Sequence, residues 1–410
     1  MKIALVTGAF LPHLGGVEMG AYHLAQQMRA LGHSVHVITS RTPRALPTED
    51  MVDGIPVHRL GFYLYRDSLK SLGACLLWAP AACRRYARLI SEHAFDVVNV
   101  RFFYHSAFFT YLLLPLLQRR NVRVVVTLEG GDAPNIPEDY RACHRSEARA
   151  LDWAAFRLLP AADAVTAVSK ELRQTTLHRI PELRGRVHVI PNGVDPSFFL
   201  PGPFCHSTSI VSVGRLSREK GFDLLIRAFA SVHTSLPQWR LVIVGDGPLR
   251  ETLQRLVDDL GLHGAVEFKG RQLPQEVLHL LQQSAFFALA SRREGCSLAA
   301  LEALACGKPV LISDVGGARE MLATPALGRL APRESVEGLE KGMRELIHRQ
   351  SDFLSMGAQC RRWVERHYAW ERIAPEYLHV YADTEKRRSR PHHFELSATA
   401  YSRMAADAWP

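Results

Sequence analysis

Short apolar runs alternate with helical segments along almost the whole chain, and this alternation limits the folds that the chain can adopt. In the first half, the runs that we expect to be strands lie at residues 2–7, 34–39, 97–100, 122–128, 164–168 and 187–190. They are apolar nearly throughout, which is typical of parallel strands covered by helices on both faces. The sequence therefore predicts an α/β fold assembled from strand–helix–strand units.

The same pattern starts again after residue 200. Further strands are expected at 210–213, 240–244, 266–269, 285–290 and 309–313. The segment PSFFLPGPFCHSTS separates the two series, and its proline, glycine and serine content indicates a hinge. A chain of 410 residues is also longer than one core usually supports. We predict two Rossmann-like domains, 1–200 and 201–372, whose ligand-facing loops at the carboxyl ends of the strands face each other across a cleft.

The formal net charge of +9 favours anionic partners such as sugar nucleotides, anionic lipid head groups or nucleic acids. An ordinary basic surface that keeps the protein soluble explains the charge equally well. The chain contains no Cys/His finger and no basic strand interleaved with aromatic residues, which argues against a nucleic-acid partner. The stretch 69–93 carries Lys70, Arg84, Arg85 and Arg88. It is either an amphipathic helix with a solvated basic face or a surface that docks on an anionic membrane.

The cysteines and the apolar runs bear on location. Seven cysteines, an odd number without a Cys-x-x-Cys pair, argue against a disulfide framework or a zinc site and for a reducing cytoplasm. The apolar run after Met1 is too short for a signal peptide, and no run reaches the length of about 18 apolar residues that spans a membrane. We expect a cytoplasmic protein, and peripheral attachment to the inner membrane face stays an open alternative.

In the segment 291–320, the acids Glu294 and Glu302 are separated by seven residues. A Gly-Cys-Ser turn follows the first acid, and a short Ala/Leu-rich helix carries the second roughly two turns along. Backbone amides at the start of such a helix can bind an anion, so that phosphate and ribose hydroxyls are held together. The residues expected to form this binding turn and helix are Gly295, Cys296, Ser297, Leu298 and Glu302.

A second group of candidates follows the expected strand 210–213. Gly214 and Arg215 open the loop, and Lys220 stands next to Gly221. Two cations in a glycine-containing loop at the carboxyl end of a strand suit a diphosphate, whose charge they can neutralise as it departs. No Asp-x-Asp motif for a metal is present. We predict that Arg215 and Lys220 replace a metal ion, so that no metal or other cofactor is needed.

Gly15 and Gly16 lie between a strand and a helix. Glycine at such a place lets backbone amides approach a phosphate or sugar, or it simply permits a tight turn. The Gly-x-Gly-x-x-Gly motif of dinucleotide sites is absent. Glu18, in the first turn of the following helix, is expected to be structural because a negative charge is favourable there.

Two further turns allow two interpretations each. Gly245 belongs to a Gly-Asp-Gly turn that either lines a base pocket or only links a strand to a helix beginning at Pro248. Asn192 and Gly193 form a strong turn signal by themselves.

These residues belong to a set of motifs that resembles a known family. The motifs are PHLGGVE, VSKEL at 168–172, IPNGVD, VGRLSREKG, the Glu-x7-Glu pair and WERIAPEYL at 370–378. Together they resemble the GT-B glycosyltransferases of family GT4, the retaining "glycosyl transferases group 1", over about residues 2–381. The resemblance implies two Rossmann-like doubly wound domains that face a central cleft.

The resemblance also assigns roles. The domain 201–372 would bind a nucleotide-diphosphate sugar, with a UDP- or GDP-sugar expected, and 1–200 would bind a glycan or lipid-linked acceptor. Arg215 and Lys220 would hold the diphosphate, Glu294 would contact the transferred sugar, and Glu302 the ribose. Gly15 and Gly16 would close over the donor. The helix 373–385 would cross back to the first domain, and 386–410 would form a poorly ordered tail.

One residue departs from the family pattern. The loop after the strand 122–128 reads TLEGGDAP, and relatives commonly have His where this chain has Glu129. A carboxylate there repels a diphosphate unless it is protonated or turned away. Asp132 in the same loop matches the family and would face the acceptor. Both residues are therefore candidates for the catalytic site.

The resemblance implies transfer of a hexose to an acceptor hydroxyl with retention at the anomeric carbon, in surface polysaccharide or glycolipid biosynthesis. Two alternatives stay open. Glu129 motivates a sugar-nucleotide-binding protein with little turnover, and the fold also suits an epimerase that acts on a free sugar nucleotide.

Overall fold

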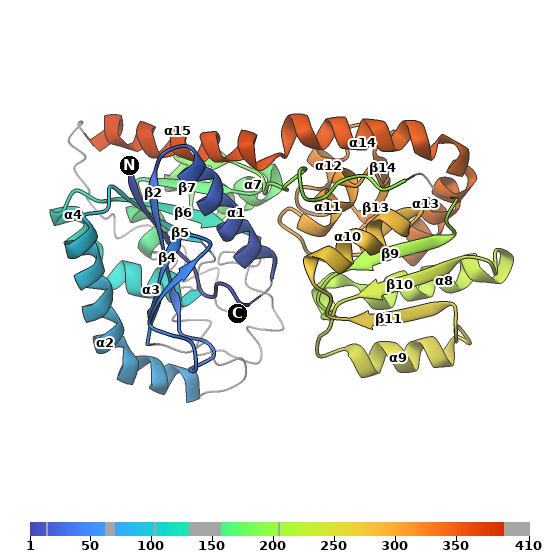
Figure 1. Ribbon diagram of the computed structural model, residues 1–410, viewed down its shortest axis with the longest axis horizontal. Helices are drawn as coiled ribbons and strands as arrows, with labels where there is room; N and C mark the ends of the chain where they lie inside the picture. Colours follow the sequence, from blue (N-terminus) through green and yellow to red (C-terminus); the bar gives the residue numbers. More distant parts are fainter. Residues whose placement is uncertain (14, 62–69, 102–103, 131–156, 204–205, 389–410) are drawn as a thin grey trace.

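The computed structural model describes the chain apart from residues 14, 62–69, 102–103, 131–156, 204–205 and 389–410. It contains two largely parallel β-sheets, one of eight strands and one of six, in two lobes that lie side by side (Figure 1). This arrangement confirms the predicted α/β fold with two doubly wound units. Among the described helices, none combines the length and the apolar character needed to cross a bilayer.

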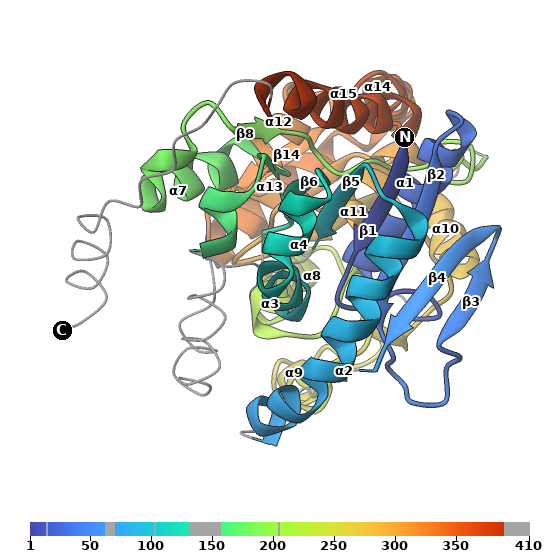
Figure 2. The same ribbon diagram turned by 90° about the vertical axis from the view of Figure 1, so that its left-hand side faces the viewer.

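The N-terminal lobe holds the larger sheet, whose strand order is β3-β4-β2-β1-β5-β6-β7-β8. Neighbouring strands are parallel except β3 and β4, which pair antiparallel at the edge of the sheet (Figure 2). The strands are β1 (Lys2–Val6), β2 (Ser34–Ser40), β3 (Glu49–Val52), β4 (Ile55–Leu60), β5 (Val97–Arg101), β6 (Arg123–Leu128), β7 (Ala164–Ala167) and β8 (Val187–Val189). The helices are α1 (Gly16–Ala30), α2 (Lys70–His93), α3 (Tyr104–Leu112), α4 (Leu114–Arg119), α7 (Lys170–Arg179) and the short 3-10 helix Pro181–Leu183. The antiparallel pair was not expected, because β3 is a polar edge strand without an apolar run.

Alternate residues of the central strand β1 supply the two faces of this sheet. Ile3 and Leu5 pack with residues of α1 and of the C-terminal helix α15 (Trp370–Arg388). Ala4 and Val6 belong to the core on the opposite face, together with residues of α2 and α3. All four side chains are buried. The strand is covered on both faces, as its continuous apolar run predicts.

The C-terminal lobe holds the smaller sheet, with the order β11-β10-β9-β12-β13-β14 and only parallel pairs. Its strands are β9 (Ser209–Val213), β10 (Arg240–Val244), β11 (Val266–Gly270), β12 (Phe286–Leu289), β13 (Val310–Ser313) and β14 (Gly328–Ala331). Its helices are α8 (Phe222–Ser235), α9 (Arg250–Asp259), α10 (Pro274–Gln283), α11 (Leu298–Ala305), α12 (Ala318–Met321), α13 (Val336–His348) and α14 (Phe353–His367), with 3-10 turns at Arg218–Lys220 and Gln350–Asp352. Strand β14 was not expected. The helix predicted to begin at Pro248 begins at Arg250, whose amide first closes a turn on the carbonyl of Gly247.

The last helix returns over the N-terminal lobe, so that α14 and α15 run along one side of both lobes (Figure 1). Helix α15 packs against α1 and β6. Its first residue, Trp370, donates a backbone hydrogen bond to the carbonyl of Val194. Three turns further along, Asn99 of β5 donates to the hydroxyl of Tyr381 at 2.6 Å. The two lobes are therefore joined twice, once by the chain after β8 and once by this helix.

Helix α15 starts before and ends after the expected range 373–385. The first residues of the expected tail 386–410 belong to the helix, which extends to Arg388. The remainder, 389–410, lies outside the described residues.

Each sheet reverses its strand order at one point. In the larger sheet successive strands run outward in opposite directions from β1 and β5, and in the smaller sheet from β9 and β12. In open α/β sheets, ligands bind in the crevice beyond the carboxyl ends of the strands at such a reversal. The loops after β1, β5, β9 and β12 are therefore where a binding site is expected.

Candidate active site

The loops after β9 and β12 bring a cation and an acid together. Lys220 Nζ donates to Glu294 Oε2 at 2.6 Å, and the hydroxyl of Ser291 donates to the same oxygen at 3.1 Å. The side chains of Lys220 and Glu294 are 26% and 19% exposed. The group predicted to hold the diphosphate thus contacts the group predicted to hold the sugar.

The loops around this pair depend on glycine. Gly245 has a φ of +136°, and a Cβ there would lie 1.9 Å from the carbonyl oxygen of Gly214. The amide of Gly214 donates to the carbonyl of Val244, which fixes the loops after β9 and β10 against each other. Arg215 follows Gly214 and is exposed. The aliphatic part of Lys220 lies 3.7 Å from the position of a Cβ at Gly214, so both predicted cations stand at this loop.

The Gly-Cys-Ser turn leads into helix α11 as predicted. Ser297 is the N-cap, and its hydroxyl accepts a hydrogen bond from the amide of Ala300 at 3.4 Å. Cys296 is buried, and burial raises the pKa of its thiol to about 12, so it is not a nucleophile near neutral pH. The neighbouring amide of Gly317 donates to the carbonyl of Gly295 at 2.8 Å. The Gly-Gly loop therefore supports the backbone of the binding turn.

Glu302 lies in the middle of α11 and is half-buried. Burial raises the pKa of its carboxyl from 4.5 to about 7. No described residue forms a hydrogen bond or an ion pair with this side chain that would offset the cost of its burial. A carboxyl without such a partner is suited to accept hydrogen bonds from the hydroxyls of a ligand.

The glycines after β1 form the facing wall. Gly15 is the N-cap of α1, and a Cβ there would lie 2.3 Å from Glu18 Oε2, so the Glu18 carboxylate folds over the start of its own helix. Burial raises the pKa of Glu18, and the charge of Glu129 acts in the same direction. A Cβ at Gly16 would lie 3.5 Å from Leu298 of the other lobe. The wall expected to close over a donor is thus in contact with α11.

The two lobes touch through the loops after β6 and β12. A Cβ at Gly295 would lie 2.1 Å from the carbonyl oxygen of Glu129, so only glycine permits this approach. Asn192 donates from Nδ2 to the carbonyl of Cys296 at 3.1 Å, and the amide of Lys170 donates to Glu320 Oε1 at 2.8 Å. The Asn-Gly turn at 192 has a role beyond its turn signal, since it bridges the lobes.

Glu129 has a buried partner that the sequence did not indicate. Arg101, at the carboxyl end of β5, donates from Nη2 to Glu129 Oε1 at 2.5 Å, and the two side chains are 0% and 4% exposed. The guanidinium also lies over the ring of Tyr377, 5.5 Å from its centre. The carboxylate at this unusual position therefore has its charge compensated within the N-terminal lobe. Asp132, predicted beside it, lies outside the described residues.

Comparison with known proteins decides the family. The model of the "Glycosyltransferase Family 4" matches residues 14–198, and that of the "Glycosyl transferases group 1" matches residues 206–370. The chain belongs to glycosyltransferase family 4. It is an enzyme that transfers sugars from nucleotide sugars.

Two curated relatives of this GT4 glycosyltransferase cover nearly its whole length. The GDP-mannose-dependent alpha-(1-6)-phosphatidylinositol monomannoside mannosyltransferase of Mycolicibacterium smegmatis is 28% identical over 385 residues, which are 89% of this chain and 94% of that protein. The N-acetyl-alpha-D-glucosaminyl L-malate synthase of Bacillus anthracis is 25% identical over 382 residues, 91% of this chain and 95% of that protein.

Solved structures of glycosyltransferases share the fold. Sucrose-phosphate synthase from Thermosynechococcus elongatus has a TM-score of 0.79 at 20% identity, covering 94% of this chain and all of that one. The catalytic domain of starch synthase IV from Arabidopsis thaliana, bound to ADP and acarbose, has a TM-score of 0.70 at 14% identity, covering 93% of this chain and 99% of that one. The two sheets of the GT4 chain are therefore arranged in the GT-B fold.

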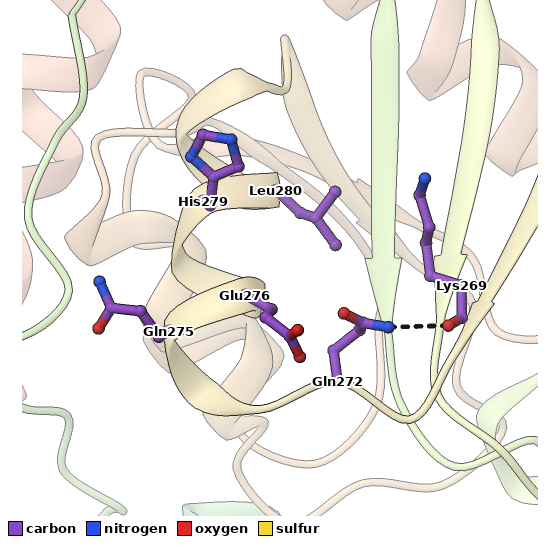
Figure 3. Close-up of a pocket in the computed structure, with 6 residues that line it drawn as sticks. All are labelled: Lys269, Gln272, Gln275, Glu276, His279 and Leu280. Carbon is purple, nitrogen blue, oxygen red and sulfur yellow. Dashed lines mark hydrogen bonds between the residues drawn. The ribbon is translucent and has the colours of Figure 1, made fainter.

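The open spaces of this GT4 glycosyltransferase differ in size and place. A hollow of ≈ 440 Å³ is lined by residues that lie on β11, directly after it or on α10, and Figure 3 labels them as Lys269, Gln272, Gln275, Glu276, His279 and Leu280. It contains none of the predicted donor residues, and β11 is an edge strand remote from the reversal at β9 and β12. The space lined by Glu294 and Ser297 is only ≈ 10 Å³, about the room of one water. The loops of the candidate site are thus in close contact.

Proposed function

We propose that this GT4 enzyme is a retaining hexosyltransferase that moves a hexose from a UDP- or GDP-sugar to an acceptor hydroxyl. The contact between Lys220 and Glu294 at the strand-order reversal carries the proposal. A cation for a diphosphate and an acid for sugar hydroxyls stand there next to the N-terminus of α11. The ranges 1–200 and 201–372 would be the acceptor-side and donor-side domains.

A bound donor would replace the contact between Lys220 and Glu294. Its diphosphate would replace Glu294 as the partner of Lys220, with Arg215 on the same loop as the second cation. Glu294 would then accept hydrogen bonds from sugar hydroxyls, and Glu302 from the ribose. Since the space beside Glu294 is ≈ 10 Å³, the loops must part before a donor can enter and close again around it.

The transfer itself needs no dedicated protein base. The bond from the anomeric carbon to the diphosphate oxygen breaks, and the acceptor oxygen forms the new bond on the same face. The acceptor proton passes to the departing diphosphate, whose developing charge Arg215 and Lys220 stabilise. Closure of the lobes excludes water and thus limits hydrolysis of the donor. Asp132 would face the acceptor in this scheme.

The nature of the relatives suggests the acceptor class. Names of curated relatives include a phosphatidylinositol monomannoside mannosyltransferase and a GDP-mannose:cellobiosyl-diphosphopolyprenol alpha-mannosyltransferase. A lipid-linked glycan, or a glycolipid at the inner membrane face, is therefore the acceptor we propose, with GDP-mannose as the first donor to test.

A binding protein without turnover is less well supported. That hypothesis rested on the negative charge of Glu129, which would repel a diphosphate. The charge is paired with Arg101, so this argument for it is weakened. An epimerase would change the sugar nucleotide without any acceptor, so product analysis in the absence of acceptor distinguishes it.

The test is a thermal-shift screen of GDP-, UDP-, ADP- and dTDP-sugars followed by a turnover assay with the donor that raises the melting temperature. NMR of the product should show the anomeric configuration of the donor. Inversion, or no transfer to any lipid-linked or glycan acceptor by a protein that binds a donor, would refute the proposal. Loss of activity in EDTA with recovery on adding Mg²⁺ would refute metal independence.

A further inference from the structure

Three histidines from separate parts of the N-terminal lobe come together between the sheet and the end of α2. His36 lies on β2, His58 on the neighbouring strand β4, and His93 is the last residue of α2. One ring nitrogen of each lies within 4.8 Å of one in each of the other two. His58 is buried, and the other two are half-buried. The proposed transferase activity makes no use of this cluster.

We propose that His36, His58 and His93 bind a divalent transition-metal ion, with Zn²⁺ as the best match. Three imidazoles and a water form an open tetrahedral set that suits Zn²⁺. His93 adds a further favourable feature, because the carboxyl end of a helix carries partial negative charge that stabilises a cation. Helix α2 ends there because Ala94 adopts a left-handed conformation with φ of +49°.

A second layer of contacts orients one of the proposed ligands. Glu49 Oε2 on β3 contacts His58 Nδ1 at 2.5 Å, and Arg85 on α2 hydrogen-bonds to the other oxygen of Glu49. A carboxylate that accepts the Nδ1 proton leaves Nε2 of His58 unprotonated, which is the arrangement found behind metal-bound histidines.

Metal binding requires a small rearrangement. His36 Nδ1 and His58 Nε2 now share a hydrogen bond of 2.9 Å between nearly coplanar rings. Two nitrogens on one tetrahedral Zn²⁺ would be roughly 3.3 Å apart, given bonds of about 2.0–2.1 Å. The rings must turn slightly, and the proton of His36 must move to Nε2. The ring of His93, 4.4 Å from that of His36 between centres, is near enough to supply the third ligand.

The proposed metal site is separate from the candidate active site. His93 precedes the amino end of β5, whereas Arg101 stands at its carboxyl end, which is roughly 13 Å along the strand. Helix α2 packs against β4 and lies in the N-terminal lobe, on the side away from the smaller sheet (Figure 1). The ion would fasten the end of α2 to β2 and β4, and its role would be to stabilise the lobe. Failure of this proposal would leave the transferase proposal untouched.

The test is calorimetric titration of the full-length, chelator-treated protein with Zn²⁺. We expect one tightly bound equivalent in the wild type, no such binding in His58→Asn, and affinity reduced at least about tenfold in His93→Gln. Glu49→Gln removes only the outer carboxylate and should weaken binding about 10–100-fold. His263→Gln, at an exposed histidine beside Asp258, is the matched control and should bind like the wild type.

Thermal unfolding gives a second readout. Zn²⁺ should raise the melting temperature of the wild type and of His263→Gln but not that of His93→Gln, because only a folded site binds the ion. If His58→Asn does not fold, as circular dichroism would show, His93→Gln and Glu49→Gln decide the matter. Absence of stoichiometric binding in the wild type, or unchanged affinity in His93→Gln and Glu49→Gln, overturns the proposal.

Discussion

Removal of either member of the Arg101–Glu129 pair should destabilise the N-terminal lobe strongly. The two side chains are almost fully buried and contact each other at 2.5 Å. Burial by itself lowers the pKa of Arg101. The charge of Glu129 and the nearby tyrosines raise this pKa by more than burial lowers it, so the net shift is upward and the arginine stays charged. A charge left without its partner at this depth cannot be hydrated.

The magnitude follows from the burial. At a charge separation of about 4 Å and an effective dielectric constant near 20, the attraction is about 4 kcal/mol. Breaking a buried pair from one side costs about 3–5 kcal/mol. For a lobe of this size each kcal/mol lowers the melting temperature by about 2–4 °C, so Arg101→Met and Glu129→Gln should each lower it by roughly 10 °C.

Thermal unfolding followed by near-ultraviolet circular dichroism measures the effect in a double-mutant cycle. The variant that carries both changes should be more stable than the sum of the single losses predicts, because no unpaired charge is left. Glu267→Gln, which breaks the exposed contact of Glu267 with Lys269, is the control and should cost less than about 1 kcal/mol. Single losses below about 1 kcal/mol, or strict additivity, would refute the reasoning. Glu129→His, the residue common in relatives, should be as unstable as Glu129→Gln, since a neutral ring leaves Arg101 unpaired.

Four further predictions concern residues of the donor site. Glu302 should make donor affinity pH-dependent, because its carboxyl has a pKa of about 7 in the free protein and only the carboxylate form accepts hydrogen bonds from the ribose. Donor binding measured by calorimetry should weaken about tenfold from pH 8 to pH 6. The variant Glu302→Gln should show no such change. The same raised pKa means that the folded state binds the proton more tightly than the unfolded state does. The contribution of Glu302 to the free energy of unfolding should therefore fall as pH rises from 4.5 to about 7, by at most about 3 kcal/mol. If the difference in unfolding free energy between wild type and Glu302→Gln stays constant across that pH range, the prediction is wrong. Arg215→Ala should lower kcat about 10²-fold with a smaller change in the donor KM, because its charge acts most on the departing diphosphate. A raised donor KM with an unchanged kcat would contradict this, because it would mean that Arg215 contributes only to donor binding. Gly295→Ala should lower kcat/KM at least about tenfold, because a Cβ would lie 2.1 Å from the carbonyl oxygen of Glu129 and push the lobes apart. The control Gly61→Ala adds a carbon with no atom within 4 Å and should be like the wild type in the same assay.

Local patterns carried much of the fold. The expected strand at 240–244 coincides with β10, because a strand buried on both faces needs a continuous apolar run and that run is visible in the sequence. The expected strand at 266–269 nearly coincides with β11, an edge strand in which apolar and polar residues alternate. The edge strand β3 and the short strand β14 were not predicted, because they are strands through pairing with a neighbour and their own composition does not favour a strand.

The residues of the candidate donor site could be predicted from the sequence for a similar reason. Its residues lie in two short segments, 214–220 and 294–302, each of which folds as one loop or helix start, so that spacing and residue type already express the geometry. That Lys220 contacts Glu294 could not be read from either segment, since the contact depends on β9 and β12 being neighbours.

Most of the strands and helices, their division into two series, and the glycines, cations and acids at the ends of strands could be predicted from the sequence. Which of these residues contact one another depends on the tertiary structure. Arg101 neutralises Glu129, and His36, His58 and His93 converge, because parallel pairing in a sheet sets side by side residues that long helical crossovers keep far apart along the chain. Such partners have no regular spacing in the sequence, so a periodic pattern does not reveal them. Their charges and lone pairs interact strongly only because burial removes the water between them.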